Sequence, residues 1–189
     1  MKTAAIWTAT WLGLALAVTA SAQDYAVGDR LAAPAEQGAD SPEFLWDDLM
    51  PEDWDPLEPF KDLDLYALDD SDPRAIEALE RVREIWDAAP ANEALDGRSG
   101  RIAGFLVPLD WNAKEFREFL LVPYFGACIH TPPPPANQVI HVVADPPVRG
   151  FEMMEAVWVE GRLEVASSDT DMGRSGYRMQ ARSVTLYEW

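Results

Sequence analysis

The fold is set by the stretch Ala156–Val165, which reads AVWVEGRLEV. It is rich in Val and carries Trp158, and these residue types favour a pleated, half-buried β-strand. Gly161 interrupts the stretch, and a glycine inside a strand indicates a bulge or a tight bend. Because a small barrel needs such bends at its corners, this stretch predicts one strand of a barrel.

Four further stretches share this composition: Arg101–Pro108, Phe116–Tyr124, Val139–Ala144 and Tyr177–Tyr187. Turn-forming residues separate the strands, and the main predicted turns are 131–137, 145–147 and 167–176. Five strands with one helix predict a mainly β protein, built as a small, partly open antiparallel barrel of the OB type. A β-sandwich with an appended helix is the alternative, and the spacing of the strands does not separate the two.

One helix is predicted before the strands, over residues 73–89. Asp72 can cap it, Pro73 suits its first position, and Pro90 disfavours helical geometry in the residue before it. Apolar residues recur at intervals of three and four, and we expect this stripe to lie across the core: Ile76, Leu79, Val82, Ile85 and Trp86. The predicted organisation is a signal peptide over 1–22, an acidic and aromatic extension over 23–72, the helix, and a barrel-like domain over 97–189.

The charge of the chain restricts its partners. Its 189 residues include 33 acidic and 15 basic side chains, a net charge of −18. Such a chain repels phosphates, so nucleic acid is not an expected partner. A single cysteine, Cys128, excludes an internal disulfide. The acidic stretch 36–72 also carries aromatic residues, which argues against simple disorder and for a docked segment.

The first 22 residues have the features of a secretory signal. Lys2 is followed by an apolar run over 4–18 and by Ala20-Ser21-Ala22, a small-residue cleavage site. The apolar run is shorter than the roughly 20 residues that a membrane span needs. We therefore expect cleavage after Ala22 and a periplasmic mature chain without a membrane span.

One cluster could carry chemistry, because Cys128, His130 and His141 lie within fourteen residues. A thiolate with two imidazoles suits zinc or, less well, copper, with Asp110 or Asp145 as a fourth ligand. The nearby methionines 153 and 154 would favour cuprous copper if they contributed. The alternative is structural, with Cys128 as a small buried side chain and the histidines as hydrogen-bonding residues. A thiol enzyme is a third hypothesis, although no flanking protease signature or Cys-x-x-Cys pair supports it.

The same window carries the resemblance to a known family. Residues 122–138 read VPYFGACIHTPPPPANQ and resemble the signature of the bacterial exported domain-of-unknown-function family 3299. Residues 44–51, FLWDDLMP, resemble the other marked element of that family. The resemblance covers nearly all of the mature chain and includes a contact loop, Pro132, Pro133, Pro134, Pro135, Asn137 and Gln138.

The family has no established activity, so the resemblance implies a context. Its members are often found beside an ABC-type ATPase, a permease of the lipoprotein-release or macrolide-efflux type, and a His-rich exported protein linked to zinc supply. This context implies an exported, non-enzymatic accessory protein that assists an envelope ABC transporter in zinc or other metal homeostasis through the Cys/His loop. The alternative is a metal-free protein–protein interaction module that uses the proline run and the acidic aromatic segment.

Overall fold

The structure is a computed structural model that describes residues 25–31, 41–56, 58, 61, 72–110, 114–129 and 133–187. Within these residues the main elements are α1 (Pro73–Asp87), β1 (Ser99–Pro108), β2 (Glu115–Val122), β3 (Ile140–Arg149), β4 (Ala156–Thr170) and β5 (Gly173–Leu186). Three short 3-10 helices join them: η1 (Trp46–Leu49), η4 (Glu93–Leu95) and η5 (Ala136–Gln138).

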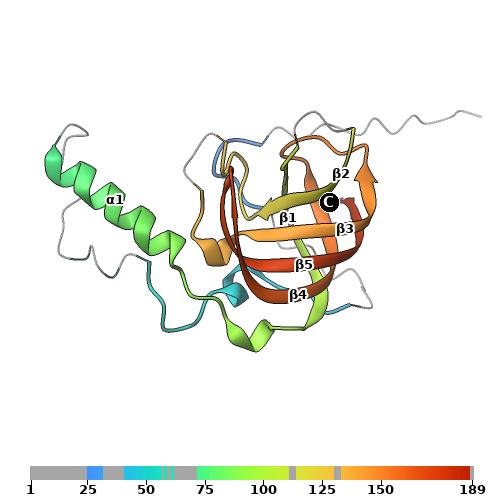
Figure 1. Cartoon of the computed structure of the whole chain (residues 1–189), viewed down its shortest axis with the longest axis horizontal. Helices are drawn as coiled ribbons and strands as arrows, with labels where there is room; N and C mark the ends of the chain where they lie inside the picture. The colour runs from blue at the N-terminus through green and yellow to red at the C-terminus, as the bar shows by residue number, and fades with distance from the viewer. Residues whose placement is uncertain are drawn as a thin grey trace, which may run out of the picture.

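The strands close into a ring in the order β1-β2-β3-β5-β4 (Figure 1). Antiparallel ladders join β1 to β2, β1 to β4, β2 to β3, and β4 to β5. The fifth ladder is parallel and joins β3 to β5, where Ile140 pairs with Tyr177 and Ala144 with Ala181. The prediction of a mainly β, partly open, OB-like barrel with one helix is therefore confirmed, because a sandwich would leave two separate sheets.

The predicted bend at Gly161 is present. The β4–β5 register shifts between Glu160 and Gly161, as it does at a bulge. A Cβ atom at Gly161 would lie 2.2 Å from the carbonyl oxygen of Gln180, so no larger residue fits there without displacing β5. The extra residue of this bulge is Arg182 on β5, because Glu160 pairs with Ser183 and Gly161 with Ala181, and Gly161 of β4 lies opposite it.

Two of the predicted turns are wrong. Residues 145–147 belong to β3, because that strand continues to pair with β2 through Val148 and Arg149. Most of 167–176 is strand, since Ser168 pairs with Ser175 and Thr170 with Gly173 across a β4–β5 hairpin that turns only at residues 171 and 172. Cross-strand pairs override the turn-forming composition in both places.

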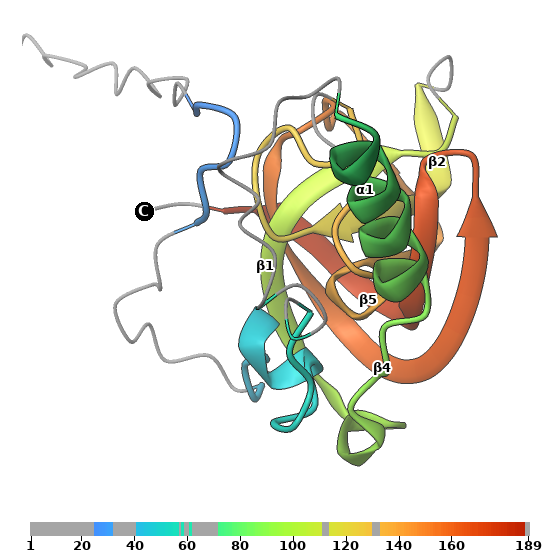
Figure 2. The same ribbon diagram turned by 90° about the vertical axis from the view of Figure 1, so that its left-hand side faces the viewer.

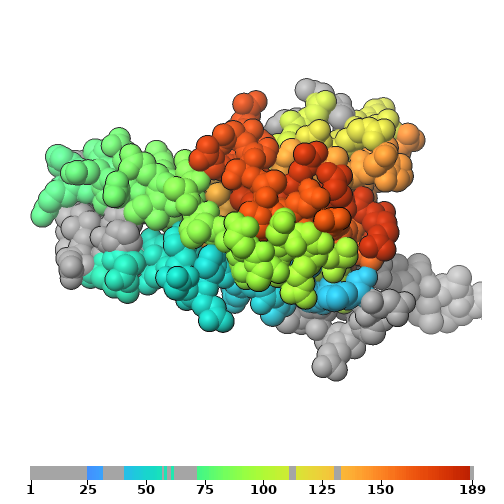
Figure 3. Space-filling model, turned by 60° about the horizontal axis from the view of Figure 1, so that its bottom comes forward, coloured from blue at the N-terminus to red at the C-terminus, as the bar shows by residue number. Residues whose placement is uncertain are grey.

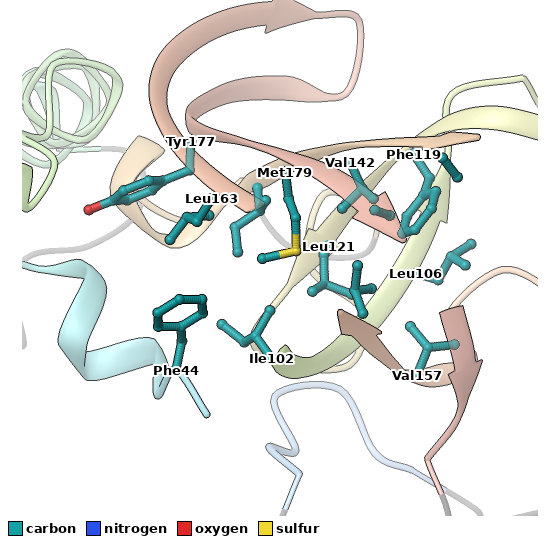
Figure 4. Close-up of a cluster of buried hydrophobic side chains, with 14 of the residues drawn as sticks. Phe44, Ile102, Leu106, Phe119, Leu121, Val142, Val157, Leu163, Tyr177 and Met179 are labelled. Carbon is teal, nitrogen blue, oxygen red and sulfur yellow. The ribbon is translucent and has the colours of Figure 1, made fainter. Parts of the chain in front are cut away.

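The barrel interior is the main hydrophobic core. Ile102, Leu121 and Met179 converge inside the ring and are fully or almost fully buried (Figure 4). A second cluster lies on the outer face of β1 and β2, around Phe105 and Leu120, where segments 25–31 and 124–129 cover it. The sheet is thus buried on both faces along these two strands.

The acidic aromatic segment docks on the chain itself. Phe44 and Leu49 are buried in the barrel core, and the indole Nε1 of Trp46 donates a hydrogen bond of 2.7 Å to the Ala103 carbonyl. A Cβ atom at Gly104 would lie 2.9 Å from the Trp46 ring, so this glycine makes room for the indole. The prediction of a docked segment is confirmed for these residues.

Helix α1 forms where it was predicted, but its packing differs. The Asp72 side chain caps it by accepting a 2.9 Å hydrogen bond from the Arg74 amide. Its apolar stripe does not cross the core: Ile76 and Leu79 are 49% and 58% exposed, and no residue of α1 belongs to either core cluster. The helix extends away from the barrel (Figures 1 and 3), and the core contains Phe44 and Leu49 of the acidic aromatic segment but no residue of α1. None of the helices described is long and apolar enough to span a bilayer.

Candidate functional site

An open groove of about 570 Å³ lies between α1 and the tip of the β4–β5 hairpin. Figure 2 shows the helix standing in front of the barrel, on the side where this groove forms. Three parts of the chain line it: the α1 face from Leu79 to Asp87, the hairpin tip from Asp169 to Arg174, and Cys128 with Pro133 of the family signature. The groove therefore unites a helix, a hairpin and the signature loop.

One face of α1 forms the first wall. Leu79, Val82 and Trp86 are spaced by three and four residues, so they share a face of the helix. More than half of the Leu79 side chain is exposed, although it is one of the largest apolar side chains of the helix. The Trp86 indole N–H is buried and has no hydrogen-bond partner within the described chain. This wall thus presents an apolar surface that the described residues leave uncovered.

The hairpin tip forms the opposite wall and is held rigidly. Arg174 donates from Nε and Nη2 to the two carboxylate oxygens of Asp169, at 2.6 and 3.0 Å. These bonds hold the pKa of the Asp169 carboxyl below its usual value. Nη1 of Arg174 also donates to the Asp87 carbonyl at 3.4 Å, which ties the hairpin to the end of α1. Met172 at the turn adds an apolar side chain to the groove.

Cys128 lies at the base of the groove, in the loop that follows β2. Its backbone is left-handed, with φ of 64°, which is uncommon for a residue other than glycine. Its side chain packs against the outer hydrophobic cluster, and burial raises the pKa of the thiol to about 12. A nucleophilic cysteine needs a lowered pKa, so the environment of Cys128 is the opposite of the one that a thiol enzyme requires.

The predicted metal ligands are distributed as follows. His141 lies on β3, is 8% exposed, and its Nε2 is 2.9 Å from Oε2 of Glu118. Asp145 accepts a 2.9 Å hydrogen bond from Arg117. His130 lies outside the described residues, and Asp110 precedes a segment that is likewise not described. Among the residues described, no three His, Cys, Asp or Glu side chains converge on one point, so the zinc or copper site stays a prediction.

The end of the signature loop, just after the proline run, has a structural role. Asn137 and Gln138 are buried, at 0% and 5% exposure. The Asn137 amide donates to the Pro90 carbonyl at 2.9 Å, and the Gln138 amide donates to the Trp46 carbonyl at 2.8 Å. These two side chains therefore fasten the end of the signature to the helix exit and to the acidic aromatic segment.

The other prolines of the run divide between core and surface. Pro134 is buried and Pro135 is half-buried, whereas Pro133 is exposed and lines the groove. A Cβ atom at Gly173 would lie 3.0 Å from Cβ of Pro133, so the hairpin tip packs directly on this proline. Pro132 lies outside the described residues.

Comparison with known families shows which family the chain belongs to. Residues 46–186 match the family model described as Protein of unknown function (DUF3299). The chain belongs to the DUF3299 family. It is also similar to a crystal structure of a DUF3299 family protein from Pseudomonas aeruginosa PAO1, with a TM-score of 0.59 and 39% sequence identity. The similarity covers 80% of this chain and 99% of that one. No curated protein matches the chain significantly.

The hairpin tip of this DUF3299 protein is the part of the groove that sequence patterns missed. Composition placed 167–176 in a turn because Ser, Asp and Gly dominate it. The signal that could have revealed the hairpin is the pairing of Asp169 with Arg174, five residues apart around the turn. Without that strand extension the hairpin would not reach α1, and the groove would lack one wall.

Proposed function

We propose that this DUF3299 protein is an exported binding module that holds an apolar, basic segment of a partner protein in the groove between α1 and the hairpin tip. The observation that carries the proposal is the open groove itself, lined by apolar side chains that include the exposed Leu79. Contiguous apolar surface on a water-soluble domain marks an interaction site. The signal-like N-terminus of the sequence supports export.

The charges at the rim define the chemistry of the partner. Asp171 carries no ion pair with any described residue, whereas Asp169 is paired with Arg174 and Asp87 interacts with the same arginine at longer range. Arg83 is a cationic side chain at the rim, and the chain as a whole carries a net charge of −18. A partner segment with Lys or Arg beside its apolar residues is therefore attracted and seated by complementary charge.

The first partners to test are those that the family resemblance suggests. An envelope ABC transporter permease and a His-rich exported metal-binding protein are both compatible with an accessory role in zinc or other metal homeostasis. In this proposal the groove holds the partner by apolar and charged contacts, and it does not depend on a bound metal. The metal-site hypothesis for Cys128 and His130 is tested separately.

Two exposed apolar residues of α1, Ile76 and Leu79, offer a matched test. Leu79 lines the groove, whereas Ile76 lies on the same helix and does not line it. Leu79→Gln should weaken binding of a fluorescein-labelled amphipathic Leu/Lys peptide about tenfold or more, because one buried leucine contributes about 1.5–3 kcal/mol. Ile76→Gln should leave the fluorescence-polarisation titration unchanged. Equal effects of the two changes, or no effect of either, would refute the groove as the binding site.

A crosslinking experiment in the native host then tests the partner. A photoreactive residue at position 79 should crosslink to an epitope-tagged permease of the neighbouring transporter, and the same residue at position 76 should not. Absence of the permease adduct at position 79, or adducts of equal yield at both positions, would contradict the transporter hypothesis.

A further inference from the structure

A second candidate binding surface lies at the end of β5, where this strand is no longer paired with β3. The parallel β3–β5 ladder ends at the pair Ala144–Ala181, yet β5 continues to Leu186. Beyond Ala144, Pro146 and Pro147 have no N–H to donate, and β3 pairs only with β2. Residues 183–186 of β5 are therefore paired on one side only, with β4, and Arg182 is the unpaired residue at the register shift before them.

On the free side of this edge, every second residue points its backbone N–H and C=O groups away from β4. Tyr187 donates from its amide to the Ala156 carbonyl at 2.9 Å, which makes that pair hydrogen-bonded. In an antiparallel ladder the hydrogen-bonded pairs alternate, so the N–H and C=O groups of Val184 and Leu186 point away from β4. No described residue bonds to them. An open edge of this kind accepts an added strand.

A cleft of about 270 Å³ runs beside the free edge. Val148, Phe151 and Val184 give it an apolar floor. Among the described residues that line it, Arg149 and Arg182 are the only charged ones, and none is a carboxylate. Arg149 pairs with Glu115, and Arg182 lies 3.9 Å from Glu160, but both arginine side chains remain largely exposed, at 74% and 68%. In a chain of net charge −18 this cleft therefore presents two exposed guanidinium groups, each with one carboxylate beside it.

We propose that the free edge of β5, residues 183–186, receives an extended acidic segment of a partner protein as an added β-strand. The backbone of that segment bonds to the N–H and C=O groups of Val184 and Leu186. Its carboxylates meet Arg149 and Arg182, and an apolar side chain between them enters the cleft against Phe151. A second copy of this chain does not suit the edge, because it would bring a second pair of arginines to the cleft where the proposed segment brings carboxylates. The proposal is independent of the groove at α1.

The test uses the whole mature chain and defined peptides at physiological ionic strength. A fluorescein-labelled, end-capped (Glu-Val)4 peptide should bind saturably and at least tenfold more tightly than the matching (Lys-Val)4 peptide. Methylation of alternate backbone nitrogens of (Glu-Val)4 should abolish binding, because it removes the donors that strand addition needs. Equal binding of the acidic and basic peptides, or binding that survives N-methylation, would overturn the proposal.

Protein variants separate the contribution of the two arginine side chains from that of the backbone N–H groups. Arg149→Gln with Arg182→Gln should weaken (Glu-Val)4 binding at least tenfold, whereas Arg162→Gln, an exposed arginine of β4 outside the cleft, should not. Leu186→Pro removes the outward N–H, and Leu186→Ala removes only the side chain, so the proline change should weaken binding more. If both Leu186 variants lose the same amount of (Glu-Val)4 binding, strand addition is contradicted. If the protein sediments as a dimer that Leu186→Pro dissociates, a second copy of the chain occupies the edge and the proposed occupant is wrong. Circular dichroism confirms that each variant is folded.

Discussion

The Tyr177 hydroxyl joins parts of the chain that are far apart in sequence, and its removal should destabilise the protein measurably. Tyr177 is fully buried on β5 (Figure 4). Its hydroxyl donates to the Leu49 carbonyl at 2.7 Å and accepts from the Asn92 amide at 2.6 Å. Burial raises the pKa of this hydroxyl to about 12, so it stays protonated and keeps its donor role at physiological pH.

Tyr177→Phe leaves both partner groups without a hydrogen bond. A buried polar group left without its partner costs about 1–3 kcal/mol, so the two together should lower the free energy of unfolding by about 2–4 kcal/mol. For a domain of this size the loss corresponds to a fall in Tm of about 5–12 °C. Urea titration followed by tryptophan fluorescence gives the change in stability, and hydrogen exchange shows whether residues 44–50 lose protection.

A matched control removes a hydroxyl that bonds to nothing. Thr185 is exposed on the same strand, and its side chain makes no hydrogen bond with the described residues. Thr185→Val should therefore change stability by less than about 0.5 kcal/mol. If Tyr177→Phe changes stability no more than this control does, the hydroxyl does not tie the aromatic segment to the barrel.

Four further predictions concern Cys128, Gly161 and the zinc hypothesis. Because burial raises the pKa of Cys128 to about 12, the folded protein should react with iodoacetamide at pH 8 far more slowly than the urea-unfolded chain; equal rates would contradict the burial of the thiol. The unfolded thiol ionises near its ordinary pKa of about 8.5, so the fold should lose stability as pH rises above that value, and Cys128→Ser should reduce this loss in urea titrations at pH 8 and pH 10. Gly161→Ala should cost about 3 kcal/mol or more in urea titration, because its Cβ would lie 2.2 Å from the Gln180 carbonyl oxygen; a change under about 1 kcal/mol would mean that the bulge is easily remodelled. If Cys128 and His130 hold zinc, elemental analysis of chelator-free protein should find near-stoichiometric metal that Cys128→Ser and His130→Ala both remove, and a metal-free parent would refute the site.

Sequence indicated the signature loop of the groove, whereas the helix wall and the hairpin wall depended on packing. The signature loop was identified as the place of interest, and Cys128 and Pro133 do line the groove. The roles of Asn137 and Gln138 were not anticipated, because their partners Pro90 and Trp46 lie 47 and 92 residues away. A hydrogen bond over such a separation leaves no periodic mark in the sequence.

Local chemistry alone determined several features of this protein. Strand composition and the glycine at 161 predicted the barrel, and a capping aspartate followed by proline predicted the start of α1 at Pro73. These signals work because backbone preference and side-chain period act over a few residues. The net charge and the single cysteine likewise restricted the partners and excluded an internal disulfide.

Only the tertiary structure decided what the helix does. An apolar stripe predicts a buried helix face, but it does not say which surface will cover that face. Here Phe44 and Leu49 belong to the core, whereas Leu79 is exposed and α1 forms a wall of the groove. The free edge of β5 arises in the same way, because it depends on where β3 stops pairing and not on the residues of β5. Which distant segment packs on a given buried surface depends on the packing of the whole chain. The sequence pattern of one segment does not contain that information.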